Sequence, residues 1–498
     1  MNRWFSVRVT LGWAFCVSLC SFFALSCEAC AHWFVFPVAL CGMVLIPDVL
    51  DWLTGKSDLF DPVAIIALLG LHFFFVAPIL HVNWDLWMLH PLPPGDWRPW
   101  LGYMGIVNLV GLLIYQHIVH GKSKGTTRPW RRYWRLSEDR FWIVCVVLLA
   151  VSMLAQTLVY YQFGGVQGYI HAYEMRDYER AFRGMGWIFM ISESFPILAF
   201  MCYTIASQKH SWFRKWPLII AALLTFSGLG LLFGGLRGSR SNTIWGLFWA
   251  AGIVHFVIRP LKRSLVFTGL VVLVGFMFFY GLYKSYGLEA LREFGDPRAV
   301  RELALGSNRT LKNTLLMDFG RSDVQALLLY RICDNQGNYE YAMGTTYLNS
   351  LLLLIPKPMR PKLGRSKVEA GTDAQYGYYS DDWISSKVYG LAGEALLNFG
   401  IFSVPFAFAL FGWFIARMRR FLERLPTKDV RRMLAPVLIN LAIVLLVGDS
   451  DNILFFLVKY GVVPFLLLYI SSQRMWAPVL SSTAQVGYIR MAILAPRQ

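Results

Sequence analysis

The sequence has little charge and few acidic residues. Asp, Glu, Lys and Arg together make up 15% of its 498 residues, whereas 56% are hydrophobic and 16% are aromatic. A water-soluble fold of this length could not cover so much apolar side chain with so few charges. The shortage of charge therefore excludes an ordinary soluble protein and predicts a chain embedded in a lipid bilayer.

The scarcity of acids leaves a formal net charge of +17, but this surplus does not indicate nucleic-acid binding. The Lys and Arg residues stand in short clusters between apolar runs, which is the pattern of cytoplasmic loops in membrane proteins. We therefore expect no nucleic-acid partner.

The sequence also lacks the patterns of a disulfide framework and of a metal site. Cysteines inside apolar runs behave as small hydrophobic groups, and this applies to Cys16, Cys20, Cys41, Cys145 and Cys202. The single C-x-x-C motif at Cys27 and Cys30 has no second pair to complete a metal site. The histidines form no H-E-x-x-H motif and no close ligand pair on the outer face. We expect neither a metal nor another cofactor.

The apolar runs predict an all-α, polytopic membrane protein. A helix needs about 20 predominantly apolar residues to cross a bilayer. Twelve segments satisfy this length approximately: 9–26, 32–50, 63–82, 101–119, 142–161, 187–205, 217–235, 241–258, 265–283, 394–416, 433–448 and 452–470. The predicted fold is therefore a bundle of about 12 transmembrane helices.

The positions of the basic clusters predict the orientation. With the N-terminus inside, every even-numbered span ends near a loop that should be cytoplasmic, and most of these loops are strongly basic: 122–140, 209–215, 259–263 and 417–432. The loop from Asp51 to Asp61 departs from this pattern because it carries three Asp against one Lys, but acidic residues count little in the rule. We expect both termini to be cytoplasmic.

The same count divides the chain into three parts. Residues 1–283 carry spans one to nine, residues 284–390 form a large outer loop, and residues 391–498 carry the last three spans and a cytoplasmic tail. The outer loop contains helical patches such as 323–330, and three prolines interrupt an apolar run near 356–361. We expect a lid of short interfacial helices there.

The outer segments carry more cations than topology requires. They include Arg176, Arg180, Arg183, Arg237, Arg240, Arg309, Arg321, Arg331, Lys357, Arg360, Lys362, Arg365 and Lys367. Arg237 and Arg240 stand in a very short connection between two spans, beside a predicted helix N-terminus that Ser241 could cap. Two interpretations remain open: both side chains extend to lipid headgroups, or they hold a diphosphate, which guanidinium groups and free helix N–H groups both favour.

Acidic residues on the outer side are fewer, so each is a candidate acid or base. Glu193 lies inside the sixth span, where it is either paired with an outer Arg or kept neutral by hydrogen bonds. Glu394 lies where the large loop re-enters the membrane, beside glycines that allow another backbone or a ligand to approach. Glu394 is the preferred candidate. The other outer acids, each taken alone, are more typical of solvated or Arg-paired loop residues than of catalysts: Asp323, Asp381, Asp382, Asp449 and Asp451.

Aromatic side chains are interleaved with polar ones in the outer loop. Tyr347 and Asp382 belong to this group, together with Tyr339, Tyr341, Tyr376, Tyr378, Tyr379 and Trp383. Ring faces next to hydrogen-bonding groups suit a sugar, and an aromatic belt at the membrane interface explains any single ring equally well.

Three passages of the sequence form a pattern together. The first is Gly-Ser-Arg-Ser at 238–241, opening an apolar helix. The second runs from Tyr341 to Lys357 and contains Tyr-Ala-Met-Gly-Thr-Thr-Tyr-Leu and then Ile-Pro-Lys. The third is Gly-Glu-Ala-Leu-Leu-Asn-Phe-Gly at 393–400. They resemble the bacterial oligosaccharide repeat-unit polymerases, the Wzy-type O-antigen polymerases, in which similar passages read Tyr-x-x-Gly-x-x-Tyr-Leu followed by Ile-Pro-Arg/Lys, and Glu-x-x-x-Asn-Phe-Gly. The resemblance covers the C-terminal half, and the sequence departs from the family in the Lys-Pro pattern after Pro356.

The resemblance implies a GT-C-like fold and a glycosyltransferase in the bacterial inner membrane, acting at the periplasmic face. Its substrate would be an undecaprenyl-diphosphate-linked oligosaccharide, and a chain-length regulator would be a possible protein partner. Arg237 and Arg240, helped by Arg321 or Lys357, would stabilise the departing diphosphate, and Glu394 would accept the proton of the acceptor hydroxyl. Arg240 would therefore act in catalysis as well as in binding. The residues that would contact the glycan are Arg176, Arg180, Arg309, Tyr347 and Asp382.

Two other functions fit part of the pattern. An O-antigen ligase would use the same donor with a different acceptor, and these sequence features do not separate the two enzymes. A lipid-linked oligosaccharide flippase would need a cationic cavity in the membrane core, whereas the cations here gather at one face.

Overall fold

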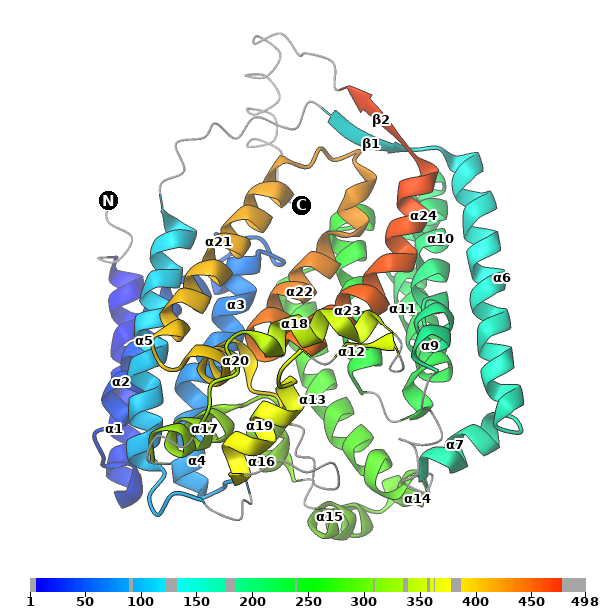
Figure 1. Cartoon of the computed structure of the whole chain (residues 1–498). Coiled ribbons are helices and arrows are strands. Elements are labelled where there is room, and N and C mark those ends of the chain that lie inside the picture. Colours follow the sequence, from blue (N-terminus) through cyan, green and yellow to red (C-terminus); the bar gives the residue numbers. More distant parts are fainter. Residues whose placement is uncertain are drawn as a thin grey trace, which may run out of the picture.

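A computed structural model of the chain shows a bundle of long helices with a group of short helices at one end (Figure 1). The structure describes residues 6–88, 93–121, 132–174, 185–237, 240–287, 289–307, 310–334, 339–355, 359–361, 363–377 and 387–476.

Nine helices in these ranges are long and apolar enough to cross a membrane. They are α1 (Val7–Ser26), α2 (Val35–Leu53), α3 with η3 and α4 (Pro62–Leu71, His72–Val76, Ala77–Trp84), α5 (Arg98–His120), α6 (Glu138–Gln162), α9 with α10 (Gly186–Ser192, Phe195–Lys209), α11 (Trp216–Phe233), α13 (Arg263–Tyr286), and α23 with η12 and α24 (Ser450–Phe456, Leu457–Gly461, Val462–Ser471). The prediction of a multi-pass helical membrane protein is confirmed. The count of twelve spans stays a prediction.

The other three predicted spans correspond to shorter or more charged helices. Segment 241–258 corresponds to α12 (Arg240–Ile253) with η6 (Val254–Ile258), and 433–448 to the 13-residue α22 (Ala435–Val447). The single helix expected over 394–416 is wrong, because the chain forms α20 (Gly390–Phe399) and α21 (Ser403–Arg424) instead. Gly400, with a φ of 77°, ends α20, and few L-residues adopt this conformation.

The two ends of the bundle differ in character. At one end, which we call the β end, strand β1 (Arg132–Leu136) pairs antiparallel with β2 (Ser472–Trp476), and Arg132 lies opposite Trp476. The expectation of an all-α chain missed this two-stranded sheet, whose strands join the start of α6 to the end of α24. The Arg132 guanidinium lies 4.2 Å from the centre of the Trp476 ring, a cation–π contact that ties the strands together.

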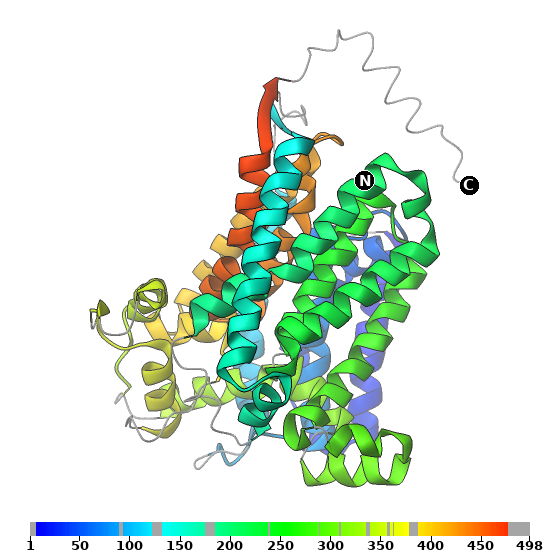
Figure 2. The ribbon, with the colours of Figure 1, turned by 90° about the vertical axis from the view of Figure 1, so that its right-hand side faces the viewer.

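The other end, which we call the insertion end, carries most of the segment between α13 and α20 (Figures 1 and 2). Its described elements are α14 (Glu289–Arg292), η7 (Glu293–Gly295), α15 (Pro297–Gly306), α16 (Leu311–Asn313), η8 (Thr314–Asp318), α17 (Ser322–Asp334), α18 (Thr345–Leu351), η9 (Leu352–Leu354) and α19 (Lys367–Tyr376). Helix α19 begins with a capping box, in which Ser366 and Glu369 satisfy each other's backbone N–H groups.

Five further short elements connect the helices in the described ranges: η2 (Glu28–Cys30), α7 (Val166–Glu174), η4 (Ser211–Arg214), η5 (Gly235–Arg237) and η11 (Val430–Met433). Ser194 lies at the break between α9 and α10.

Close packing of α5 against α21 joins the first and last parts of the chain. Gly111 of α5 lies against the ring of Phe408, and Gly412 of α21 lies against the backbone of Tyr115. Phe408 and Tyr115 are both almost fully buried. Because the glycines lack a Cβ, the two helices approach closely, as small residues allow in membrane helix pairs. This contact holds α21, and through it α20, in a fixed position.

Candidate functional site

Glu394 of α20 is held inside the protein by hydroxyl and amide donors from two other elements. Thr346 of α18 donates its hydroxyl to Oε1 across 2.8 Å, and the Ser450 hydroxyl donates to the same oxygen across 2.5 Å. The backbone N–H of Ser450 donates to Oε2 across 2.7 Å. The residue is 3% exposed, so a carboxylate there depends on these donors in place of water.

Asn398, one helical turn after Glu394, connects the same elements a second time. Its Nδ2 donates to the Thr346 hydroxyl (2.7 Å) and to the backbone carbonyl of Glu394 (2.8 Å), while its Oδ1 accepts from the N–H of Gly344 (2.9 Å). Gly344 has a φ of 86°, which favours glycine at this turn into α18. We call Glu394, Thr346, Asn398 and Ser450 the Glu394 network.

A charged cluster borders this network, because Asp449 precedes Ser450 in the turn between α22 and α23. Oδ1 of Asp449 accepts the backbone N–H groups of Tyr389 and Gly390, each across 2.8 Å. Its Oδ2 lies 3.1 Å from Nζ of Lys367, which lies 3.3 Å from Oδ2 of Asp451. We call Lys367, Asp449 and Asp451 the Lys367 cluster.

Lys367 remains a cation although it is buried. Burial alone lowers the pKa of an ammonium, but the carboxylates of Asp449 and Asp451 outweigh that effect, and the pKa of Lys367 is raised above its usual 10.5. Lys367 also donates to the backbone carbonyl of Lys387 across 3.1 Å. The cluster therefore brings one cation and two anions to the edge of the Glu394 network.

Arg321 adds a second cation near Asp449. It lies between η8 and α17, where burial lowers the pKa of its guanidinium while the carboxylates of Asp449 and Asp323 oppose that shift. An arginine with so high an ordinary pKa stays charged despite this shift. Among the predicted phosphate-binding cations, Arg321 is the one whose side chain the structure describes, and it interacts electrostatically with Asp449 of the Lys367 cluster.

Tyr347 is the predicted glycan-binding residue that lies nearest to Glu394 in the chain of contacts. It follows Thr346 on α18 and is 37% exposed, yet its hydroxyl reaches the Glu394 network, where it shares a side-chain hydrogen bond with Asn398. Burial and the charge of Glu394 raise the pKa of this hydroxyl.

Several predicted site residues cannot be placed. Arg176, Arg180, Arg309, Lys357 and Asp382 lie outside the described residues. For Arg237 and Arg240 only the backbone is described: η5 ends at Arg237, and α12 begins at Arg240. The first residues of η5 contact α13, because the Tyr280 hydroxyl donates to the carbonyl of Gly235 and the Tyr283 hydroxyl to that of Leu236.

Sequence reasoning missed most partners of Glu394. No pattern in the sequence singled out Ser450. The only indication for Thr346 was its place in the second passage of the resemblance, and for Asn398 its place in the third. Lys367 and Asp449 were among the outer charges. The signal that could have singled out Asp449 is the Asp-Ser-Asp run at 449–451. These residues interrupt two apolar helices with almost no loop between them.

The structure gives Glu193 a partner that we did not expect, and its pairing with an outer Arg stays a prediction. Oε2 of Glu193 lies 2.5 Å from Nζ of Lys459. Both side chains are buried, and Lys459 stands in the π-helical turn η12. A π turn inserts an extra residue, and such turns are frequent at functional sites.

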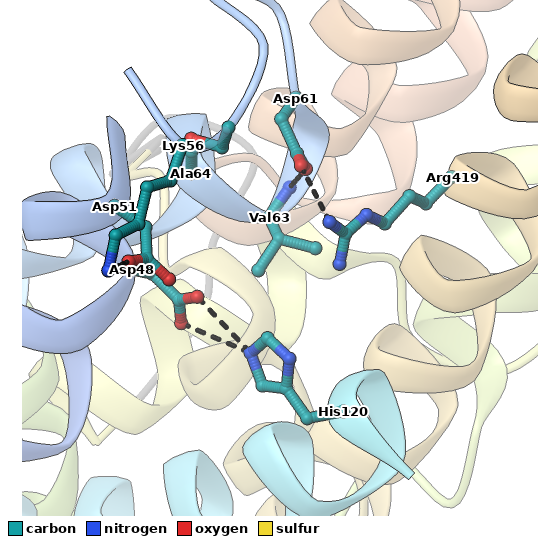
Figure 3. A pocket seen from close by; sticks show the side chains of 9 residues that line it. Asp48, Asp51, Lys56, Asp61, Val63, Ala64, His120 and Arg419 are labelled. Carbon is teal, nitrogen blue, oxygen red and sulfur yellow. Dashed lines mark hydrogen bonds and ion pairs between the residues drawn. The ribbon is translucent and has the colours of Figure 1, made fainter. Parts of the chain in front are cut away.

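A separate polar cavity of about 220 Å³ lies at the β end (Figure 3). It is formed by the ends of α2, α3, α5 and α21. Oδ2 of Asp61 lies 2.9 Å from the Arg419 guanidinium, and Oδ1 of Asp48 lies 3.2 Å from Nε2 of His120. None of the predicted site residues that the structure describes lines this cavity.

The fold and the site define a multi-pass, α-helical membrane protein with a buried, charged polar network near its insertion end. No protein-family model, curated protein or solved structure matches the chain.

Proposed function

We propose that this protein is a membrane glycosyltransferase that polymerises undecaprenyl-diphosphate-linked oligosaccharide repeat units at the periplasmic face of the inner membrane. The observation that supports this most is the Glu394 network. It joins Gly344 and Thr346 from one passage resembling the Wzy-type polymerases to Glu394 and Asn398 from another, although the two passages are separate in the sequence.

The charges near this network suit a diphosphate leaving group. In the proposed reaction, the acceptor hydroxyl forms a bond with the anomeric carbon of the donor glycan, and the bond from that carbon to the diphosphate oxygen breaks. The undecaprenyl diphosphate leaves with the electron pair. Arg321, together with Arg237, Arg240 and Lys357, would stabilise the growing negative charge, because guanidinium and ammonium groups bind phosphate oxygens strongly.

Glu394 would receive the proton that the acceptor hydroxyl loses. Both of its oxygens already accept hydrogen bonds, so the acceptor would reach the carboxylate by replacing the hydroxyl of Ser450 or Thr346. These donors would hold the carboxylate in place until then, as positioned groups do in general base catalysis.

The test is gel analysis of surface polysaccharide from a bacterium whose own copy of the gene is deleted. The strain is complemented with the wild type, Arg240→Ala, Glu394→Gln or the control Arg301→Ala, which changes an exposed residue of α15. The proposal expects single-repeat glycans in the deletion strain and long chains with the wild type and Arg301→Ala. It expects the chains to be lost with Arg240→Ala and Glu394→Gln at equal protein levels.

Other outcomes would contradict parts of the proposal. Complete loss of surface glycan in the deletion strain would favour an O-antigen ligase or a flippase. Normal chains with Glu394→Gln at normal protein levels would remove Glu394 from its role as the base.

A further inference from the structure

The segment formed by α18 and η9, residues Thr345–Leu354, has two opposite faces. Thr346 and Ser350 are buried against the protein, at 1% and 6% exposure. The other face consists of leucines that are 40% to 58% exposed: Leu348, Leu351, Leu353 and Leu354. No charged residue occurs between Tyr341 and Ile355. A soluble loop would seldom expose so continuous an apolar face.

This segment lies beside the membrane-crossing helices and not beyond their ends. It packs against α23, which is the first part of the candidate span Ser450–Ser471, and Thr346 hydrogen-bonds to Glu394 of α20. Figure 1 shows α18 level with α20, α22 and α23, running across the direction of α21 and α22. Figure 2 shows this yellow-green part of the chain on the outside of the bundle.

The length of the segment excludes a crossing of the bilayer. Ten helical residues extend about 15 Å, which is half of the roughly 30 Å hydrocarbon core. A short helix with one apolar face and one polar face lies in a single leaflet, parallel to the membrane plane. The exposure of Leu351, at 58%, is similar to that of Leu154 at 61%, which lies on the long span α6.

Charge borders the segment on both sides. After η9, the Arg360 guanidinium donates to the carbonyl of Ile355 across 3.1 Å. Before α18, Glu340 pairs with Arg365 across 2.9 Å. An apolar stretch bounded by charges matches the change from acyl chains to headgroups in a bilayer.

We propose that α18 and η9 are inserted in the leaflet on the insertion side, with their leucine face against lipid acyl chains and Arg360 at the headgroup level. The occupant of this face is lipid. Only the thickness of this one helix then separates the acyl chains from Glu394, since Thr346 on its inner face contacts the carboxylate.

The test is spin-label accessibility in liposomes, with the full chain reconstituted. Cys27, Cys202 and Cys333 are replaced by Ser, since the other cysteines are buried. A nitroxide is then attached to the cysteine introduced by Leu351→Cys. A second variant, Leu348→Cys, places the label at another position on the same face. Leu154 on α6 serves as the lipid-facing control, and the exposed Glu302 on α15 serves as the water-facing control.

The proposal expects labels at Leu351 and Leu348 to collide with oxygen, which dissolves in hydrocarbon, several-fold more than with a water-soluble nickel complex. This is the pattern expected at Leu154 and the reverse of that at Glu302. Nickel access equal to that at Glu302 would show a water-facing loop and overturn the proposal. Exclusion of both reagents would show that protein, such as a second copy of the chain, covers the face, and would also overturn it. Neither readout depends on glycosyltransferase activity.

Discussion

Thr346 donates a hydrogen bond to Glu394 across 2.8 Å, although 48 residues separate them in the sequence. The same hydroxyl accepts from Nδ2 of Asn398. One small side chain therefore attaches α18 to α20 at the centre of the candidate site.

The first prediction tests this attachment. Replacing Thr346 with Val keeps the shape of the side chain and removes its hydroxyl, so that Asn398 and Glu394 each lose a buried hydrogen-bond partner. We expect a loss of stability of about 1–3 kcal/mol, the usual cost of leaving such groups unsatisfied. The measurement is the thermal unfolding midpoint in detergent, with Thr346→Ser as the control that retains the hydroxyl. A Val variant as stable as the wild type would show that the bond contributes nothing.

The second prediction concerns the Lys367 cluster. Lys367→Met removes the ion-pair partner of the fully buried Asp449 carboxylate, for which we expect a cost of up to about 3–5 kcal/mol. Adding Asp449→Asn should recover much of that loss, because the more deeply buried of the two carboxylates that Lys367 contacts is then neutral. Chemical denaturation of the two single variants and the double variant measures this coupling. Additive losses in the double variant would contradict it.

The pH dependence of the same ion pair follows from the direction of the pKa shift. The pKa of Lys367 is raised in the folded protein, so its contribution to stability is complete below the ordinary value of 10.5 and is lost only as the pH rises through the raised value. We therefore expect the destabilisation caused by Lys367→Met to be the same at about pH 7.5 and about pH 9. A penalty that shrinks steadily across this range would mean that Lys367 loses its proton there.

The third prediction tests the packing of α5 against α21. A Cβ at Gly111 would lie 2.4 Å from Cδ2 of Phe408, which is too close for any real contact. We expect Gly111→Ala to destabilise the protein by about 1–3 kcal/mol through overpacking. Phe408→Leu removes part of the ring that the new methyl group would touch. The double variant should therefore lose less stability than the sum of the losses of Gly111→Ala and Phe408→Leu. Thermal unfolding of all three variants provides the comparison.

The fourth prediction concerns the break between α20 and α21. Gly400 has a φ of 77°, and an added Cβ would lie 3.0 Å from the Tyr341 hydroxyl, so Gly400→Ala should cost about 1–2 kcal/mol. Gly228 is the matched control. It stands inside α11 with no atom near its Cβ position, and Gly228→Ala should stabilise that helix by about 0.5–1 kcal/mol. Equal effects of the two substitutions on the unfolding midpoint would refute the role of the positive φ.

The sequence predicted the positions of most helices well because a bilayer imposes a simple requirement. Each crossing needs a long apolar run, and such runs are visible without any knowledge of packing. The helix break at Gly400 escaped notice because a positive φ changes no hydropathy value. The β1–β2 sheet escaped notice because its strands lie at opposite ends of a long stretch of chain.

The candidate site was only partly predictable for a related reason. Glu394 could be selected because an acid in an apolar setting is costly and therefore conspicuous. Its partners Thr346 and Ser450 are ordinary polar residues, and only the three-dimensional arrangement makes them donors to one carboxylate. The contact of Lys459 with Glu193 was equally hidden, since the two residues lie in separate apolar runs.

The pairing of β1 with β2 has a mechanical consequence. The strands β1 and β2 flank α6 and α24, so these two helices are joined at the β end as well as packed against each other. A motion that separated α6 from α24 at this end would have to break the backbone hydrogen bonds of the strand pair.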